Sequence, residues 1–547
     1  MLFSSILILI VAKALPLIKI SSIHFTRISA IILLLSGILS FNILYIQSIG
    51  SGIGIYSGLF QITNISQTIE LFLLIIGSII LIGWPTKESK YSIDYSIIIL
   101  FSTLGSSLLI SSFDLISLYL SIELQSFGLY ILSTLYRNSE SSTNAGLKYF
   151  LLGGLSSCII LLGSGLIYAY TGLTQLESIY SLISTTNIDY ILQGTFLGII
   201  LIFIGLLFKI SAAPLHNWSP DVYDETPTIV TIWLTIMPKI SILIILLEIY
   251  TQINIHSIFY TPMGTAEPSI FNLITINGLN IKEVIKNIFL ISSILSLIIG
   301  TVVGLAQIKI KRLLAYSTIS HIGFMLLALA INTEQSIDSF IFYLIQYIIT
   351  NLNIFLILLA ISYYIPTNSS RTAKVYASTV ADESRATDIK FIKELQGLFF
   401  ANPLLSLTLT ISLFSMAGIP PLIGFFSKQF VLYSALEQGY YFMSILAILV
   451  SVISASYYLK IIKILHTSPA EAGGVASLTA KAGATNSTVN LTASISRAAS
   501  LELPEITTNA VHSFMISSLS LFILFFIFKP TLILSSTQVL SLTLFNL

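Results

Sequence analysis

The sequence predicts an all-α protein that crosses a membrane many times. Of its 547 residues, 55% are hydrophobic and only 9% are charged, whereas about 25% of the residues in a soluble protein are charged. The mean hydropathy is +0.94. Because one span needs roughly 20 apolar residues, the hydropathy pattern predicts about 14 transmembrane helices. Their centres lie near Leu9, Leu35, Leu74, Ile99, Leu120, Ile160, Phe203, Trp233, Leu295, Leu326, Phe355, Leu409, Ile448 and Phe522.

The distribution of basic residues predicts how these helices are oriented. Most Lys and Arg residues between helices fall in the odd-numbered loops; for example, Lys309, Lys311 and Arg312 follow the ninth helix. Among the even-numbered loops, only the one that contains Lys282 and Lys286 carries basic residues. By the positive-inside rule, the odd-numbered loops face the side of synthesis and both ends of the chain face the other side.

We expect residues 1–547 to form a single membrane domain with two longer polar loops. Residues 366–393 are polar and charged, and residues 467–509 are rich in Ala, Ser, Thr and Gly. Both loops fall on the positive side, and the composition of the second is typical of a flexible linker. Neither loop is long enough to build a hydrophobic core of its own.

The composition also excludes several classes of function. The net charge is +1, so the chain has no basic field for nucleic acid. Its single cysteine, Cys158, cannot supply a thiolate metal cage or an iron–sulfur cluster. The glycines of residues 50–54 are followed by Ser57 where a dinucleotide-binding fingerprint needs its last glycine. We therefore expect no metal and no cofactor in this chain, and any electron transfer to take place in another chain.

Four charged residues interrupt predicted helices at the depth of the membrane: Glu123, Lys209, Lys239 and Lys428. Each should cost about 2.5–3.5 kcal/mol at a helix centre unless it is paired or hydrated. One interpretation is that buried ion pairs merely fix the packing of the helices. However, one carboxylate cannot neutralise three lysines, so we favour a polar interior that conducts ions or protons.

Two predicted helices are also broken by Pro and Gly, in residues 211–220 and 416–424, close to Lys209 and Lys428. Proline removes a helical hydrogen bond. Irregular backbone at membrane depth is stable only inside protein or beside a wet cavity, and a pair of breaks in corresponding halves indicates a transport site. The layout is consistent with two halves of about five helices each.

Two histidines are candidates for proton transfer. His321 lies in the middle of a predicted span, and His216 lies at the first helix break. A neutral imidazole can accept a proton on one nitrogen and release it from the other. The alternative is that each histidine is a hydrogen-bonded packing residue. Lys148 lies in the first turns of the sixth helix, where a solvated position is sufficient to explain it.

Five segments together resemble a known family. They are residues 114–124, 145–153, 209–228, 313–323 and 414–428, which include Glu123, Lys209, Lys428 and both helix breaks. In their order and spacing, these segments are similar to the antiporter-like membrane subunits of respiratory complex I, the NADH:ubiquinone oxidoreductase. The resemblance implies two inverted five-helix repeats, helices 4–8 and 9–13, in which helices 7 and 12 are broken.

The resemblance also implies roles for the candidate residues. Glu123 would pair with Lys209, Lys239 would be the central relay, and Lys428 would be the terminal site. Further positions match family residues that are linked to the polar axis: Lys148, His216 and His321. The expected function is proton translocation along this axis, driven by quinone reduction elsewhere in the complex.

The same resemblance implies the setting of the chain. NAD, FMN, iron–sulfur clusters and ubiquinone would belong to other subunits. The expected partners are other membrane-arm subunits, including sister antiporter-like subunits, and membrane lipids, in the mitochondrial inner membrane with the positive side facing the matrix. Two alternatives stay open, namely a stand-alone cation/proton antiporter of the same fold and a structural spacer that does not pump.

Overall fold

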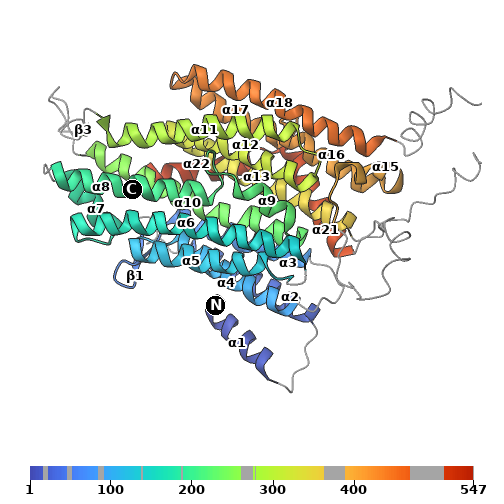
Figure 1. Ribbon diagram of the computed structural model, residues 1–547, viewed down its shortest axis with the longest axis horizontal. Helices are drawn as coiled ribbons and strands as arrows, with labels where there is room; N and C mark the ends of the chain where they lie inside the picture. The colour runs from blue at the N-terminus through green and yellow to red at the C-terminus, as the bar shows by residue number, and fades with distance from the viewer. Residues whose placement is uncertain are drawn as a thin grey trace, which may run out of the picture.

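The computed structural model shows an elongated bundle of α-helices whose axes run roughly along its longest dimension (Figure 1). It describes residues 1–15, 22–45, 52–83, 92–136, 139–185, 189–259, 275–276, 279–362, 388–467 and 510–545. Within these residues, 11 helices are long and apolar enough to cross a membrane. Shorter apolar helices are Leu2–Ala14, Asp94–Ile110, Pro403–Ala417 and Thr531–Leu544. The prediction of an all-α, multi-pass membrane protein is confirmed.

Every span centre predicted from hydropathy lies inside a helix. The first part of the chain forms α1 (Leu2–Ala14), α2 (Ser22–Ile43), β1 (Ile53–Ile55), β2 (Phe60–Ile62), α3 (Asn64–Ile82), α4 (Ser92–Ile110), α5 (Leu115–Ser133), α6 (Glu140–Thr171), α7 (Leu176–Thr185), α8 (Asp189–Lys209), α9 (Trp218–Glu225) and α10 (Thr228–Phe259). The second part forms β3 (Thr275–Ile276), β4 (Leu279–Asn280), α11 (Ile281–Leu305), α12 (Ile310–Ile331), α13 (Glu334–Ser362), the 3-10 helix η3 (Ile392–Leu395), α15 (Leu398–Ala401), α16 (Pro403–Ala417), α17 (Ile423–Glu437), α18 (Tyr441–His466), α21 (Ala510–Phe525), the 3-10 helix η4 (Phe526–Phe528) and α22 (Thr531–Phe545). The exact number of spans and the inverted repeats remain predictions.

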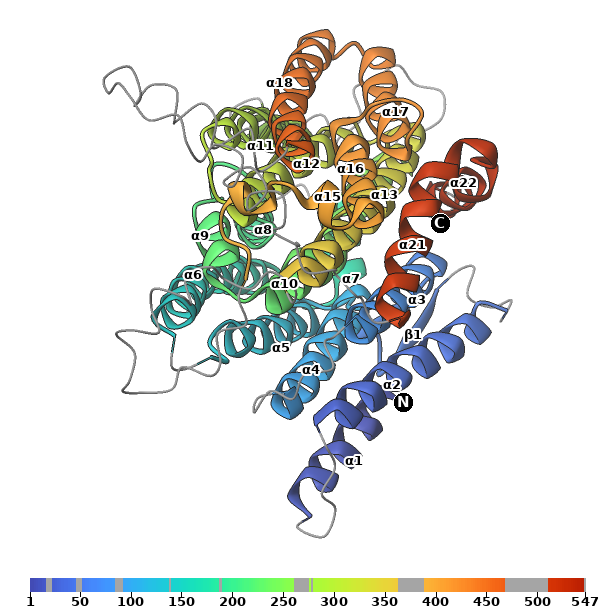
Figure 2. The ribbon, with the colours of Figure 1, turned by 90° about the vertical axis from the view of Figure 1, so that its right-hand side faces the viewer.

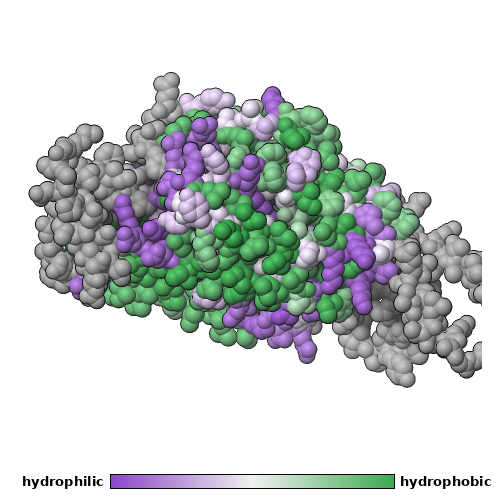
Figure 3. Space-filling model, turned by 90° about the horizontal axis from the view of Figure 1, so that it is seen from above, coloured by the Kyte–Doolittle hydropathy of each residue, from purple (hydrophilic) through white to green (hydrophobic). Residues whose placement is uncertain are grey.

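Three helices form the centre of the bundle. The apolar windows of α10, α12 and α13 are each 94% buried, whereas that of α6 is 28% buried. Figure 2 shows these three helices enclosed between α4, α5 and α6 on one side and α16, α17 and α18 on the other. The outer helices turn large apolar side chains outward, such as Leu147, Leu151 and Leu155 of α6. Hydrophobic residues accordingly cover the middle of the face seen in Figure 3, as expected for a surface in contact with lipid.

Polar side chains satisfy the exposed backbone groups where helices begin. Asp114 precedes α5 and accepts a hydrogen bond from the backbone N–H of Ile116 at 2.8 Å, while the Ser117 hydroxyl accepts one from the Asp114 backbone N–H. Such reciprocal caps replace helical bonds that the first turn lacks. The Asp114 carboxylate also accepts from the hydroxyl of Thr174 at 2.7 Å. The position of Asp114 near a helix end is therefore structural.

Both helix breaks lie where Pro and Gly predict them. The seventh predicted span consists of α8 and the short helix α9, and the twelfth consists of α16 and α17. A residue with positive φ follows each first half: Ser211 at 63° and Gly418 at 84°. The residues next to each break are buried, namely Ser211, Ala212 and Ala213 at the first break and Met416 and Ala417 at the second.

Of the two long polar loops, residues 388–393 and residue 467 are described. In the first of them, Asp388 pairs with Lys311 at 2.6 Å, Ile389 is buried, and η3 packs against α18. The predicted flexible linker and the remainder of residues 366–393 lie outside the described residues.

The helices α6 and α8 approach each other closely at two glycines. A Cβ atom on Gly163 would lie 2.6 Å from the carbonyl oxygen of Gly198, and one on Gly198 would lie 2.7 Å from that of Gly163. Both obstacles are backbone atoms, which cannot rotate away. Since α8 ends at Lys209, this contact also fixes the position of a candidate site residue.

We expect Gly163→Ala to destabilise the protein by about 1–3 kcal/mol, because the new methyl group forces the two backbones apart. Gly165→Ala on the same helix is the control, since a Cβ there has nothing within 4 Å. The thermal unfolding midpoint of the detergent-solubilised protein should fall only for Gly163→Ala. Equal midpoints for the two variants would contradict the close packing of α6 and α8.

Candidate functional site

Glu123 and Lys209 form a buried ion pair between α5 and the end of α8. Lys209 Nζ lies 3.7 Å from Glu123 Oε1, and the side chains are 7% and 15% exposed, respectively. This distance is longer than a direct hydrogen bond, so the attraction is mainly ionic. The second carboxylate oxygen of Glu123 accepts from the Ser126 hydroxyl at 3.5 Å. Lys209 is also the last residue of α8, where the helix dipole favours a cation.

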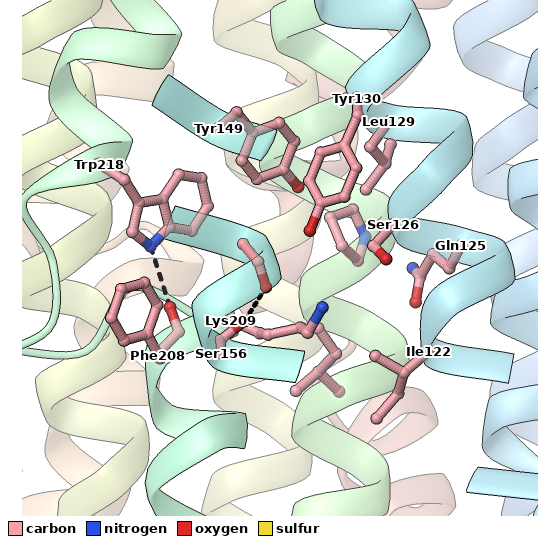
Figure 4. Close-up of a pocket in the computed structure, with 13 residues that line it drawn as sticks. Ile122, Gln125, Ser126, Leu129, Tyr130, Tyr149, Ser156, Phe208, Lys209 and Trp218 are labelled. Atoms are coloured by element: carbon pink, nitrogen blue, oxygen red, sulfur yellow. Dashed lines mark hydrogen bonds between the residues drawn. The ribbon is translucent and has the colours of Figure 1, made fainter. Parts of the chain in front are cut away.

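A small cavity surrounds the Lys209 amine. Its volume is about 20 Å³, which is enough for roughly one water molecule. Figure 4 shows the Lys209 side chain entering this space, with the Tyr130 hydroxyl pointing toward it. Trp218 of α9 lines one side of the cavity. Its indole N–H donates to the carbonyl oxygen of Phe208 at 3.0 Å, which holds the ring in place. The cavity extends to Pro238 of α10, the neighbour of the next lysine.

Lys239 lies at the centre of the bundle without a carboxylate. It is buried and follows Pro238 inside α10. Its Nζ donates to the hydroxyl of Tyr347 at 3.2 Å and lies 5.5 Å and 5.6 Å from the ring centroids of Tyr223 and Tyr347. Among the described residues, no carboxylate forms an ion pair with it. The cation is therefore held by one phenol oxygen and two aromatic faces.

His321 connects the middle of the bundle to the second broken helix. Its Nδ1 lies 2.7 Å from the Tyr343 hydroxyl, and its Nε2 lies 3.3 Å from the Tyr458 hydroxyl. A neutral imidazole donates from one nitrogen and accepts at the other, so both contacts can be hydrogen bonds. The ring centroids of His321 and Tyr347 are 5.7 Å apart.

Lys428 is held by the end of a half-helix. It is buried in α17, and its Nζ donates to the carbonyl oxygens of Ala417 at 2.8 Å and Met416 at 3.1 Å. These two residues end α16, whose unpaired carbonyls carry partial negative charge. The amine also lies 5.7 Å from the ring centroid of Phe324. The break between α16 and α17 thus supplies ligands for the cation.

The other two predicted site residues do not contact this buried row. His216 lies between α8 and α9, with Nδ1 3.2 Å from the carbonyl oxygen of Pro214. Lys148 is 45% exposed and pairs with Asp221 at 3.1 Å, and Asp221 also pairs with Arg312 at 2.6 Å. The roles of His216 and Lys148 in the polar axis remain predictions.

Phenol groups that were not among the residues predicted from the sequence connect the charged residues. Tyr343 and Tyr347 lie one helical turn apart on α13, and Asn351, one turn further, donates to the Tyr347 hydroxyl at 3.1 Å. Polar groups at this spacing on one face of an apolar helix could have indicated them. In the described part of the chain, no group of three or more His, Cys, Asp and Glu residues could hold a metal ion.

Comparisons with known proteins identify the class of this fold and site. The family model described as NADH:quinone oxidoreductase/Mrp antiporter, TM, matches residues 112–285 and 257–454. The structure is similar to a chain of respiratory complex I from Thermus thermophilus, with a TM-score of 0.70 at 24% identity, covering 98% of this chain and 99% of that one. It is also similar to a chain of the Mrp complex from Dietzia sp. DQ12-45-1b, with a TM-score of 0.69 at 18% identity, covering 98% and 96%. The chain is thus an antiporter-like membrane protein.

The comparison of sequences is more specific. NADH-ubiquinone oxidoreductase chain 2 of Rhizopus oryzae is 47% identical over 567 aligned residues, which cover 100% of both chains. The chain belongs to the NADH:quinone oxidoreductase/Mrp antiporter family and, within it, to the group of NADH-ubiquinone oxidoreductase chain 2.

Gly418 should be needed for the position of Lys428. A Cβ at this residue would lie 2.9 Å from Lys428 Cδ, whereas one at Gly439 has nothing within 4 Å, and both glycines have positive φ. Alanine should cost about 1–2 kcal/mol of backbone strain at either position. At position 418 it should also weaken a hydrogen bond to a charged group, worth about 1.5–3 kcal/mol. Thermal unfolding should therefore show a larger loss for Gly418→Ala than for Gly439→Ala, and equal losses would contradict the proposed packing of Lys428.

Proposed function

We propose that this chain is a proton-translocating subunit of the membrane arm of NADH-ubiquinone oxidoreductase in the mitochondrial inner membrane. The observation that carries the proposal is the buried row from the Glu123–Lys209 pair through Lys239 and His321 to Lys428. It crosses the centre of an apolar bundle, where ionisable groups usually mark a transport path. The full-length similarity to chain 2 supports the assignment to this complex.

The Glu123–Lys209 pair is the group whose geometry can control proton movement. Two charges about 4 Å apart attract by about 4 kcal/mol at an effective dielectric constant near 20. Moving one charge against 100 mV requires about 2.3 kcal/mol. Separating the pair would leave a desolvated ammonium that releases its proton more readily. Toggling one ion pair is therefore sufficient to push one proton against a membrane potential of this size.

The remaining groups would carry the proton onward. Lys239 bonds Tyr347, whose ring lies beside His321, and His321 bonds two further phenols. Buried polar atoms without a hydrogen-bond partner in the described residues include Tyr223 Oη and Asn351 Oδ1. Buried polar atoms of this kind are normally satisfied by ordered water. Water and phenols together would bridge the distances between the lysines.

Other subunits would supply the chemistry that drives this transfer. NAD, FMN, iron–sulfur clusters and ubiquinone would bind elsewhere in the complex, and quinone reduction would change the Glu123–Lys209 pair through the neighbouring subunits. The apolar outer faces of helices such as α6 offer surfaces for sister antiporter-like subunits and for lipid. This chain would take part in the NADH:ubiquinone reductase reaction as the conduit for protons.

A stand-alone cation/proton antiporter is the second candidate, because the structural similarity to the Mrp complex chain is close to that for complex I. The axis itself favours the complex I subunit. It presents three buried lysines and one carboxylate, whereas hard metal cations prefer several oxygen ligands. A third candidate, a spacer without pumping, would make the ion pair dispensable for transport.

Native electrophoresis of mildly solubilised membranes distinguishes the first two candidates. We expect peptides of this chain in the large band that stains for NADH dehydrogenase activity. Migration as a small separate particle would support the stand-alone antiporter, and sodium and proton fluxes would then be measured.

Replacing Glu123 with Gln, or Lys209 with Ala, should lower the number of protons translocated per NADH oxidised in the assembled, reconstituted complex. Gln keeps the size of the side chain but removes the charge that holds Lys209. Lys13→Gln is the control, since it breaks an exposed ion pair with Asp94 outside the buried row. An undiminished proton yield in both site variants, with normal assembly, would refute the pumping role and leave the spacer.

A further inference from the structure

A second buried carboxylate–lysine pair lies at the positively charged end of the bundle. Lys311, 4% exposed at the side chain, donates to Asp388 Oδ2 at 2.6 Å and to the carbonyl oxygen of Thr226 at 2.9 Å. Asp388 also accepts from the hydroxyl of Thr228 at 2.5 Å and from its backbone N–H at 3.0 Å. The pair therefore links the start of α12, the start of α10 and the segment before η3. The Asp388 side chain is 18% exposed, so it connects solvent with the buried amine.

Hydroxyl groups lead from this pair along α10 toward Lys239. The hydroxyls of Thr226 and Thr231 are 3.1 Å apart. With 3.6 residues per turn, positions 228, 231, 235 and 239 lie on one face of α10. The three threonines and Lys239 at these positions are all buried. The bulky Trp233, which packs on α4 through Ser102, is on a different face. A polar stripe thus runs through about three turns at the start of α10.

The helix opposite this stripe supplies a matching acceptor. By the alternation of spans, α10 and α13 run antiparallel, and their contact joins Lys239 to Tyr347. One turn from this contact toward the positive end, α10 carries Thr235 and α13 carries Asn351. Asn351 donates to the Tyr347 hydroxyl, while its buried Oδ1 has no partner among the described residues. A water at this level would have a threonine and an amide oxygen as partners.

We propose that the Lys311–Asp388 pair and the threonine stripe of α10 form the route by which protons from the positive side reach Lys239. The inference rests on the proposed function. Asp388 accepts a proton from bulk water and passes it to the amine of Lys311 after that amine has released its own proton inward. The threonines and waters each accept a proton on oxygen and release another, and the neutral amine of Lys239 takes up the last one. Only O–H and N–H bonds change, and one proton is transferred in total.

The pair also has a structural role that must be separated from transfer. Asp388 accepts from the first backbone N–H of α10, so its side chain caps that helix. Asn at this position retains an acceptor for the N–H group and removes the charge. The threonines carry no charge, and Val has nearly the same shape as Thr. Substitutions on α10 therefore test the route without removing the cap.

Thr235→Val should reduce the proton yield per NADH of the reconstituted complex as much as Lys239→Ala does. The matched control is Thr251→Val on the same helix. Thr251 is equally buried and bonds carbonyl oxygens of the preceding turn, as Thr235 does, but it lies beyond Lys239. Thr251→Val should behave like the unaltered complex, and Thr235→Ser, which restores the hydroxyl, should recover the yield.

A normal proton yield in Thr235→Val, together with a low yield in Lys239→Ala, would overturn the route and leave the proposed function intact. Normal yields in both would overturn the proposed function as well. Asp388→Asn provides a second test, which keeps an acceptor for the first N–H of α10 and removes the charge of the pair. We expect it to assemble and to lose the same fraction of the proton yield, and a normal yield in this variant would exclude the pair from the route.

Discussion

The energetic penalty of placing a cation in a medium that cannot hydrate it governs the arrangement of this protein. Burial of an ammonium group costs several kcal/mol unless nearby groups replace its water shell. Three lysines solve this problem in different ways: Lys209 with a carboxylate, Lys239 with a phenol and two aromatic faces, and Lys428 with helix-end carbonyls. Only the first partner carries a full charge. Of the three lysines, Lys209 is therefore the one whose proton changes most in energy when its partner is displaced by a small distance. Lys239 and Lys428, which have neutral partners, are suited to relay positions.

The broken helices and the buried cations depend on each other. A break exposes carbonyl groups that a membrane interior cannot satisfy, and the Lys428 amine donates to two of them. At the first break, the indole of Trp218 donates to the carbonyl oxygen of Phe208, the residue before Lys209. Removing the cation would leave carbonyls unsatisfied, and straightening the helix would leave the cation without partners. Each feature therefore stabilises the other inside the bundle.

The sequence was sufficient to predict features that are local in the chain. A charge inside an apolar run and a Pro–Gly interruption of a helix are visible without tertiary contacts, so Glu123, Lys239 and both breaks could be located. The residues that bond to these groups in the folded protein could not be located in this way. Lys311 adjoins Arg312 and reads as part of a solvated basic loop, whereas its partner Asp388 follows α13, far along the chain. The structure pairs Lys148 with Asp221 at an exposed position, and its role in the axis, which the family resemblance implied, remains a prediction.

The charge balance of the two buried pairs explains how they can act on one lysine. Glu123–Lys209 and Lys311–Asp388 are each neutral while both members are ionised, so neither repels a proton on Lys239. If a proton binds to a carboxylate, or a carboxylate moves away, the pair becomes a net positive charge. Repulsion then acts on Lys239, which has no carboxylate partner among the described residues to hold its own proton. Under the proposed function, the proton would move toward His321, whose ring lies 5.7 Å from that of Tyr347, the phenol bonded to Lys239. Under the proposed function, a neutral pair on each side of an unpaired lysine would let a change in one pair displace the proton of Lys239.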